Sequence, residues 1–166
     1  MSSIIKVDQI QTAAGGVPTA ADLGLNVSGT VLQVVRHSLT SNIATASTSY
    51  VPTGHSVSIT PKASNSIILV EFKGGRVWIP NSSNQLDVAI AINGDTSSLT
   101  DRRLAAFYQS NSAVHTGVYG SEYFTNVGTS PITYAAYFKS GSGQQLSIND
   151  AYTSFQQSLV VTEIAG

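Results

Sequence analysis

The residues with the clearest chemical potential are Trp78 and the polar segment that follows it. Within seven positions the chain supplies the amides Asn81, Asn84 and Gln85. An aromatic ring beside amide groups can stack on the apolar face of a sugar while the amides hydrogen-bond its hydroxyls. Aromatic side chains also serve in core and subunit packing, and this second interpretation of Trp78 stays open. The sequence therefore offers one candidate ligand surface, formed by these four residues.

A second candidate is the loop from Asp95 to Arg103, which holds the one local cluster of charges, with Arg102 and Arg103 at its exit. This cluster favours an ion-pair site, solvated or at an interface, over an anion pocket.

Catalysis and metal binding are not indicated. His37, His55 and His115 have no spacing that would place two ligands on one face, so we expect surface or rim histidines. The acidic residues are dispersed, and there is no nucleophile elbow, phosphate loop or dinucleotide fingerprint. We expect no enzyme activity, no catalytic residue, no metal ligand and no cofactor.

Composition narrows the possible partners. Charged residues make up 10% of the chain, and 24 serines and 16 threonines supply much of its polarity. A net charge of -1 provides no basic field for nucleic acid. There is no cysteine and no apolar run of about 18 residues, so we expect no membrane insertion. Lys6 and Asp8 interrupt the first apolar patch, which argues against a signal peptide and for synthesis in the cytoplasm.

Hydrophobic periodicity predicts an all-β fold, an antiparallel sandwich without a long helix. The predicted strands cover residues 30–37, 47–51, 55–60, 66–73, 76–79, 86–93, 103–109, 114–124, 132–138, 145–149 and 158–164. Gly74-Gly75 is expected to bend the chain, and Asn93-Gly94 to form a two-residue hairpin turn. The run Ile67 to Val70 is apolar at every position, which suits a strand covered on both sides.

The first 28 residues are expected to form a separate anchoring arm before a head domain at 29–166. Thr19, Asp22 and Gly24 can cap and end a single helical turn, which is too short to be stable alone. The arm therefore needs a surface, either its own sandwich or, as we favour, another chain. The predicted anchoring residues are Ile4, Ile5, Val7, Ile10 and Leu23.

Four segments resemble a group of bacteriophage virion structural proteins, described as tail fibre-like and common in marine and cyanobacterial phages. They are IIKVDQIQTAAGG, PTAADLGLNVSGTVLQVV, SVSITPKASNSIILV and LVVTEIAG. The resemblance covers residues 4–70 and 159–166, whereas 71–158 carries no motif of the group. It implies an N-terminal anchor peptide and a jelly-roll-like head that trimerises like the heads of complement-type and tumour-necrosis-factor-type proteins.

The resemblance implies a virion protein made in the cytoplasm of a host bacterium and docked on other virion proteins by its arm. One function is a short tail fibre or similar appendage whose head recognises host surface carbohydrate. The alternative is a capsid decoration protein, a cement protein or head fibre that stabilises or ornaments the phage head. The chain leaves almost no length for a shaft between arm and head, so a long projecting fibre is not expected.

Overall fold

The computed structural model describes residues 28–80, 83–110, 112–149 and 156–166. These residues contain no helix, and therefore none that could span a membrane. The predicted arm, including Ile4, Ile5, Val7, Ile10, Leu23 and the helical turn at 19–24, lies outside the described residues. The ten strands are β1 (Val31–Leu39), β2 (Ile43–Thr45), β3 (Val51–Ile59), β4 (Ile67–Ile79), β5 (Asn84–Ile92), β6 (Arg103–Gln109), β7 (Val114–Phe124), β8 (Ile132–Ser140), β9 (Leu146–Ile148) and β10 (Gln157–Ile164).

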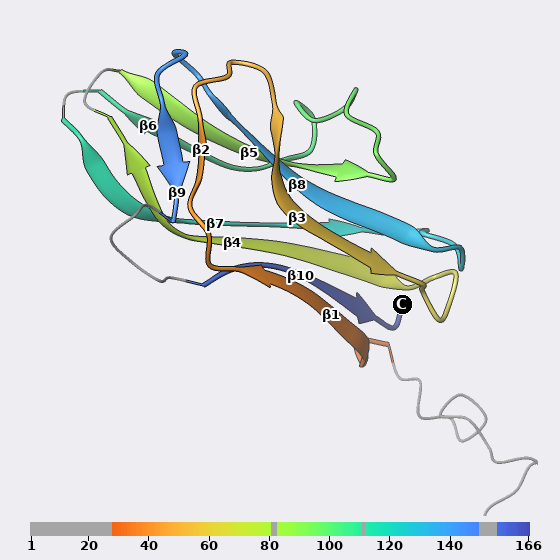
Figure 1. The fold of residues 1–166 in the computed structure, drawn as a ribbon. Coiled ribbons are helices and arrows are strands. Elements are labelled where there is room, and N and C mark those ends of the chain that lie inside the picture. Colours follow the sequence, from red (N-terminus) through yellow and green to blue (C-terminus); the bar gives the residue numbers. More distant parts are fainter. Residues whose placement is uncertain (1–27, 81–82, 111, 150–155) are drawn as a thin grey trace, which may run out of the picture.

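Two antiparallel sheets face each other in a sandwich (Figure 1). Sheet A holds six strands, in which β10 pairs with β1 and β4, β4 also pairs with β7, and the short β2 and β9 extend the sheet. Sheet B has the order β3-β8-β5-β6. Because β9 and β10 pair in succession along the same side of β4, sheet A is in effect four strands wide. The order β1-β10-β4-β7 across sheet A and the order β3-β8-β5-β6 of sheet B together give the pattern of a jelly roll, as the resemblance implied.

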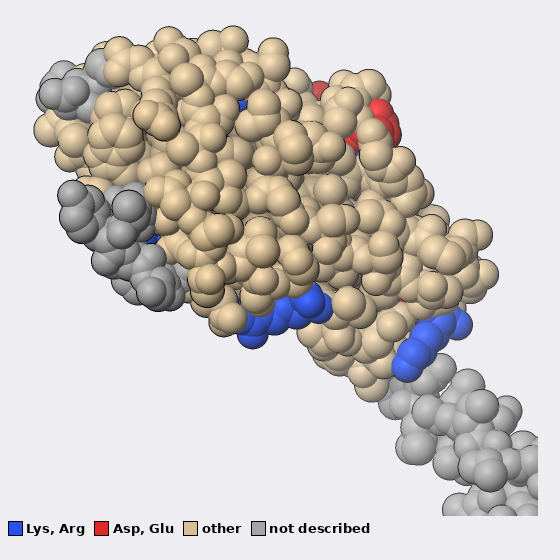
Figure 2. All heavy atoms as spheres, in the orientation of Figure 1, with Lys and Arg blue, Asp and Glu red and all other residues tan. Residues whose placement is uncertain are grey.

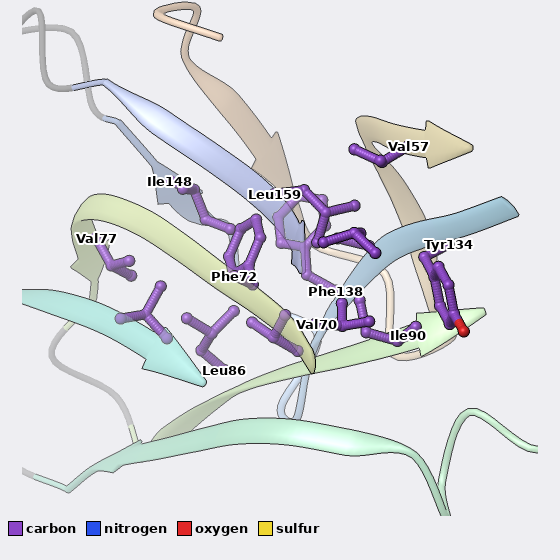
Figure 3. Close-up of a cluster of buried hydrophobic side chains, with 14 of the residues drawn as sticks. Val57, Val70, Phe72, Val77, Leu86, Ile90, Tyr134, Phe138, Ile148 and Leu159 are labelled. Carbon is purple, nitrogen blue, oxygen red and sulfur yellow. The ribbon is translucent and has the colours of Figure 1, made fainter. Parts of the chain in front are cut away.

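The core lies between the two sheets, where alternate residues of each strand point inward (Figure 3). In β4, Ile68, Val70 and Phe72 are fully buried, and their outward neighbours are not. Sheet B contributes Val88, Ile90 and Phe138, among others, to the same core. Tyr134 closes one end of this core, and burial raises the pKa of its hydroxyl to about 12.

The structure shows what becomes of two glycine-containing segments, Asn93-Gly94 and Gly74-Gly75. Asn93 and Gly94 both have positive φ, at 51° and 78°, and Asp95 N–H donates to Ile92 C=O at 2.9 Å, so the predicted turn is confirmed. Gly74-Gly75, by contrast, does not end the strand. The pairing of β4 with β7 shifts register between Lys73 and Gly75, which is a bulge inside one long strand.

Sheet B has its outer surface partly covered. Ala89 and Ala91, which alternate along β5 with the core residues Val88 and Ile90, are fully buried in a second cluster with Leu99. Asp87, on the same face, is 3% exposed and lies 3.7 Å from Arg103 Nη1 and 3.6 Å from Lys139 Nζ.

Charged side chains are sparse on the side of the molecule that Figure 2 shows. Acidic atoms appear there at the end where the loop after β5 lies.

Candidate functional site

Sheet A carries the candidate site on its outer face, the side turned away from the core. The outward residues of β4 include Ile67, Leu69, Glu71, Lys73, Arg76 and Trp78. Lys73 is exposed and the other five are half-buried. Strand pairing sets their neighbours: Leu69 lies between Thr162 of β10 and Tyr123 of β7, and Thr162 in turn faces Val34 of β1. The outer face is therefore a continuous surface across all four strand positions.

One half of the outer face is apolar, and we call it the apolar half. Its members are Val31, Val34, Ile67, Leu69, Tyr123, Val160 and Ile164. Val34 is 58% exposed and Tyr123 is 68% exposed, whereas the β4 and β10 members are half-buried. The sequence predicted that Ile67 to Val70 would be covered on both sides. Within this chain only the inward side, Ile68 and Val70, is covered.

A polar seam of three residues borders the apolar half. Tyr119 donates its hydroxyl to Glu71 Oε1 at 2.8 Å, and Lys73 Nζ lies 3.7 Å from the same oxygen. Tyr119 and Lys73 are directly paired across β7 and β4, so the seam runs across the sheet.

Beyond the seam the outer face contains a hollow of about 460 Å³. The described residues that line it are Gly75, Arg76, His115, Thr116 and Gly117. Gly75 has a φ of 66° at the β4 bulge, a conformation that favours glycine. A Cβ built on Gly117 would meet nothing nearer than Gly75 O at 3.8 Å. The absence of a side chain at Gly117 therefore leaves space above the sheet.

Polar and aromatic groups stand around this hollow. Arg76 Nε donates to His115 Nδ1 at 3.0 Å, which joins β4 to β7 and leaves the imidazole proton on Nε2 when His115 is neutral. Trp78 is paired directly with His115, and it follows Arg76 by two positions, so all three share one face of the sheet. The guanidinium of Arg76, the imidazole of His115 and the indole of Trp78 therefore lie next to one another on the outer face, beside the hollow.

The structure separates the predicted ligand surface. Trp78 is half-buried on the outer face of sheet A, whereas Asn84 and Gln85 belong to β5 of sheet B. Asn81 lies outside the described residues. Gln85 is half-buried and donates from Nε2 to Asp87 Oδ1 at 2.6 Å.

Asn84 is fully buried and serves as a scaffold. Its Oδ1 accepts from Gln85 N–H, the Ser140 hydroxyl and Ser142 N–H at 2.8, 3.0 and 3.1 Å. Its Nδ2 donates to Gln144 O at 3.2 Å. The placement of Asn84 on an exposed surface is thereby corrected, because its amide organises the turn after β8.

Other sequence candidates have plain structural roles. Asp95 accepts from Ser97 and lies 3.4 Å from Arg102 Nη1, and the Ser97 hydrogen bonds lower the pKa of its carboxyl. The histidines are not all at the surface, since His55 is 1% exposed and packs against His37. Among the residues that the structure describes, no three His, Asp or Glu side chains gather as metal ligands.

Sequence reasoning missed Arg76 and His115 as partners of Trp78. The signal available was the alternation Arg76-x-Trp78 and His115-x-Gly117, which places each pair on one face of a strand. The pairing of the two strands, 37 positions apart from Trp78 to His115, is not encoded in that local pattern.

Comparison with known proteins gives distant likenesses. No protein-family model matches the chain, and no curated protein matches it. Among solved structures it is similar to the infectious bursal disease virus VP2 subviral particle, with 12% identity, a TM-score of 0.41, and 82% of this chain and 38% of that chain covered. It is also similar to the EclA C-terminal domain, a sugar-binding protein, with 11% identity, a TM-score of 0.35, and 91% and 89% covered. A second structure of that virus, the Gx strain, has 12% identity, a TM-score of 0.38, and 81% and 37% covered.

The chain spans less than two fifths of the length of the viral chains that it matches. At these TM-scores the likenesses add nothing to the topology that the strand pairing already establishes.

Proposed function

We propose that this chain is a structural, non-enzymatic component of a bacteriophage particle, with a head domain that forms a homotrimer through the apolar half of the outer face. The observation that carries the proposal is this uncovered apolar surface on a sheet whose other side already forms the core. Contiguous apolar patches on soluble domains mark interaction sites. The sequence resemblance to phage virion proteins is the reason for proposing a phage particle as the location of the trimer.

A second copy of the chain is the occupant that suits the apolar half. None of the seven side chains of the apolar half carries a charge. Arg36 and Glu71, which are paired with Val160, border the apolar half with charge. A mainly apolar surface of this kind is matched by another of its own kind, and assembly in closed rings is the usual way in which identical subunits cover such surfaces. A neighbour over the outer face would also cover Ile67 and Leu69, which gives a physical reason for the fully apolar run in β4.

Residues 1–28 are proposed as the arm that attaches this trimer to other virion proteins. Three arms on one trimer would bind together, and linked weak contacts add up to firm attachment. The preferred location is the tail, as a short fibre or fibre-like appendage that contacts the host. Capsid decoration is the alternative, because the same trimer and arms would serve on the phage head.

The molar mass of the full-length chain in solution tests the assembly. We expect the mass of three 17.3-kDa chains by light scattering after size exclusion. The mass of a single chain at every concentration measured would contradict the proposal. Immunogold electron microscopy of particles of the encoding phage then separates tail from capsid, and a chain without residues 1–28 should remain trimeric but be absent from particles.

A further inference from the structure

We propose that Arg36 of one copy pairs with Glu71 of the next copy, and that this ion pair fixes the register in which three copies join through the apolar half. The pairing rests on the proposed function, because it needs the trimer. It supplies what apolar contact alone lacks, since a surface without charge lets neighbouring copies slide along the strands.

Arg36 is an exposed cation in β1, the strand at one edge of sheet A. Its Nε donates to Ser38 Oγ at 2.6 Å, and its Nη2 donates to Gln156 Oε1. Both acceptors are neutral, so they hold the guanidinium in place without cancelling its charge. Within the parts of the chain that the structure describes, Arg36 forms no ion pair. Its remaining N–H groups can therefore receive a carboxylate from another chain.

Glu71 is the acidic member of the polar seam, in β4. Its Oε1 accepts from the Tyr119 hydroxyl at 2.8 Å and lies 3.7 Å from Lys73 Nζ. An ion pair of this length beside an exposed lysine contributes little. Glu71 Oε2 has no hydrogen-bond partner among the described residues. The carboxylate is thus oriented by a tyrosine and can still accept from a guanidinium.

Arg36 and Glu71 point from the same face of sheet A but do not pair within one chain. Arg36 is paired with Val160 across β1 and β10, and Val160 is paired with Glu71 across β10 and β4. Two strand spacings, about 10 Å, therefore separate the two backbones. The cation lies on the β1 side of the outer face and the anion on the β4 side, so the two sides differ in charge.

A ring of three copies brings these two sides together. Identical subunits in such a ring join two different patches, here the β1 side of one copy and the β4 and β7 side of the next. Rotation about an axis along the strands leaves every residue at its own height, so residues paired across the sheet meet the same row of the neighbour. Val34 then meets Leu69 and Tyr123. At the adjacent row, Arg36 meets Glu71.

Other registers are unfavourable for Arg36. A slide of one row in one direction would place the guanidinium against Leu69 and Tyr123, where burial would leave its charge unpaired. A slide of one row in the other direction would place it against Lys73, a like charge. The register that pairs Arg36 with Glu71 also matches the apolar rows, so charge and apolar contact favour the same arrangement.

Charge reversal tests the pairing on the full-length chain, by light scattering over a dilution series. Arg36→Glu and Glu71→Arg should each raise the concentration at which the trimer is half dissociated by about tenfold or more, because like charges then meet at every interface. The double variant Arg36→Glu/Glu71→Arg should return to nearly the wild-type concentration. Arg102→Glu, in the loop after β5, makes the same change beside sheet B and should assemble as the wild type does.

Salt gives a second measurement, since it screens exposed ion pairs. Added sodium chloride should weaken the wild-type trimer more than the trimer of Arg36→Gln. Far-ultraviolet circular dichroism should show the same fold in every variant.

The pairing is overturned if both reversals assemble as the wild type does, or if the double variant stays as dissociated as the single ones. A wild-type trimer with either result contradicts the pairing and keeps the proposed trimer. A wild type that has the mass of a single chain contradicts both.

Discussion

His37 in β1 and His55 in β3 meet edge to face between the two sheets, with ring centroids 5.3 Å apart and planes at 78°. His55 also stands edge-on to Phe72 of β4, and its Nε2 lies 3.3 Å from Gln157 Oε1 of β10. The His55 imidazole, which is 1% exposed, therefore links sheet B to three strands of sheet A.

Acid should destabilise the head through His55. Burial, reinforced by the neighbouring His37, lowers the pKa of His55 although Gln157 opposes this shift. Because the folded pKa lies below the unfolded value, the unfolded chain takes up the proton first, and stability is lost as pH falls through about 6.5. Urea midpoints at pH 7.5 and 5.5 should differ, and the difference should shrink in His55→Phe. His115→Gln, which removes an exposed imidazole, should retain the full difference.

Glu163 should be needed as a carboxylate. This fully buried side chain accepts from the Ser66 hydroxyl at 2.6 Å, from Lys62 N–H at 2.7 Å and from Gln33 Nε2 at 2.5 Å. These donors outweigh desolvation and lower its pKa, so its stabilisation is present above about pH 4.5 and is lost below that value. Glu163→Gln turns an N–H toward donors and should cost about 2 kcal/mol in the free energy of unfolding. Asp101→Asn, in an exposed loop, is the control and should cost little.

Gly120 should not tolerate a side chain. A Cβ at this position would lie 2.4 Å from Leu104 O, where β7 and β6 approach each other at one edge of the sandwich. Backbone cannot withdraw as a flexible side chain can, so Gly120→Ala should destabilise by about 1–3 kcal/mol. Gly117→Ala, three residues earlier in the same strand, points into open space. Equal melting temperatures for the two variants would show that β6 and β7 are not this close.

Asn84→Ala should lower the stability of the head. It removes a fully buried acceptor of two backbone N–H groups, those of Gln85 and Ser142, at a cost of about 1–3 kcal/mol, whereas the Ser140 hydroxyl keeps Gln144 O as its acceptor. The melting temperature of the variant should fall below that of the wild type. An unchanged melting temperature would contradict the structural role of Asn84.

A charge in the apolar half should dissociate the trimer without unfolding the head. Leu69→Asp places a carboxylate where a neighbouring copy would bury it, yet Leu69 points away from the core of its own chain. We expect a monomer by light scattering with an unchanged far-ultraviolet circular dichroism spectrum. Ser56→Asp, on the exposed side of β3, adds the same charge to sheet B and should stay trimeric.

The strands were readable from the sequence because their alternation is local. Residues 103–109 and 114–124 coincide with β6 and β7, and most other predicted strands differ from the structure mainly at their ends. The strand predicted at 47–51 was wrong, because residues 47–50 lie in a bend between β2 and β3. The three-residue β2 was missed because so short a segment has no period to detect. Gly74-Gly75 was expected to bend the chain between two strands, and it forms a bulge inside one strand instead, because glycine pairs mark turns and bulges alike and β7 pairs with β4 before and after it.

The candidate site was harder to foresee. Trp78 and the amides after it are neighbours in sequence, but β4 and β5 lie in opposite sheets, so the chain reverses between them and separates their side chains. The partners that Trp78 acquires come from β7, through pairing between distant segments that local patterns do not specify.

The placement of β10 between β1 and β4 bears on how the head is made. Sheet A has its first and last strands side by side, so β1 leaves the ribosome long before its partner exists. Until residues 157–164 have been synthesised, β1 and β4 present unpaired edges that can join other chains. Nascent chains that stall just before this point should therefore be the species that holdase chaperones capture.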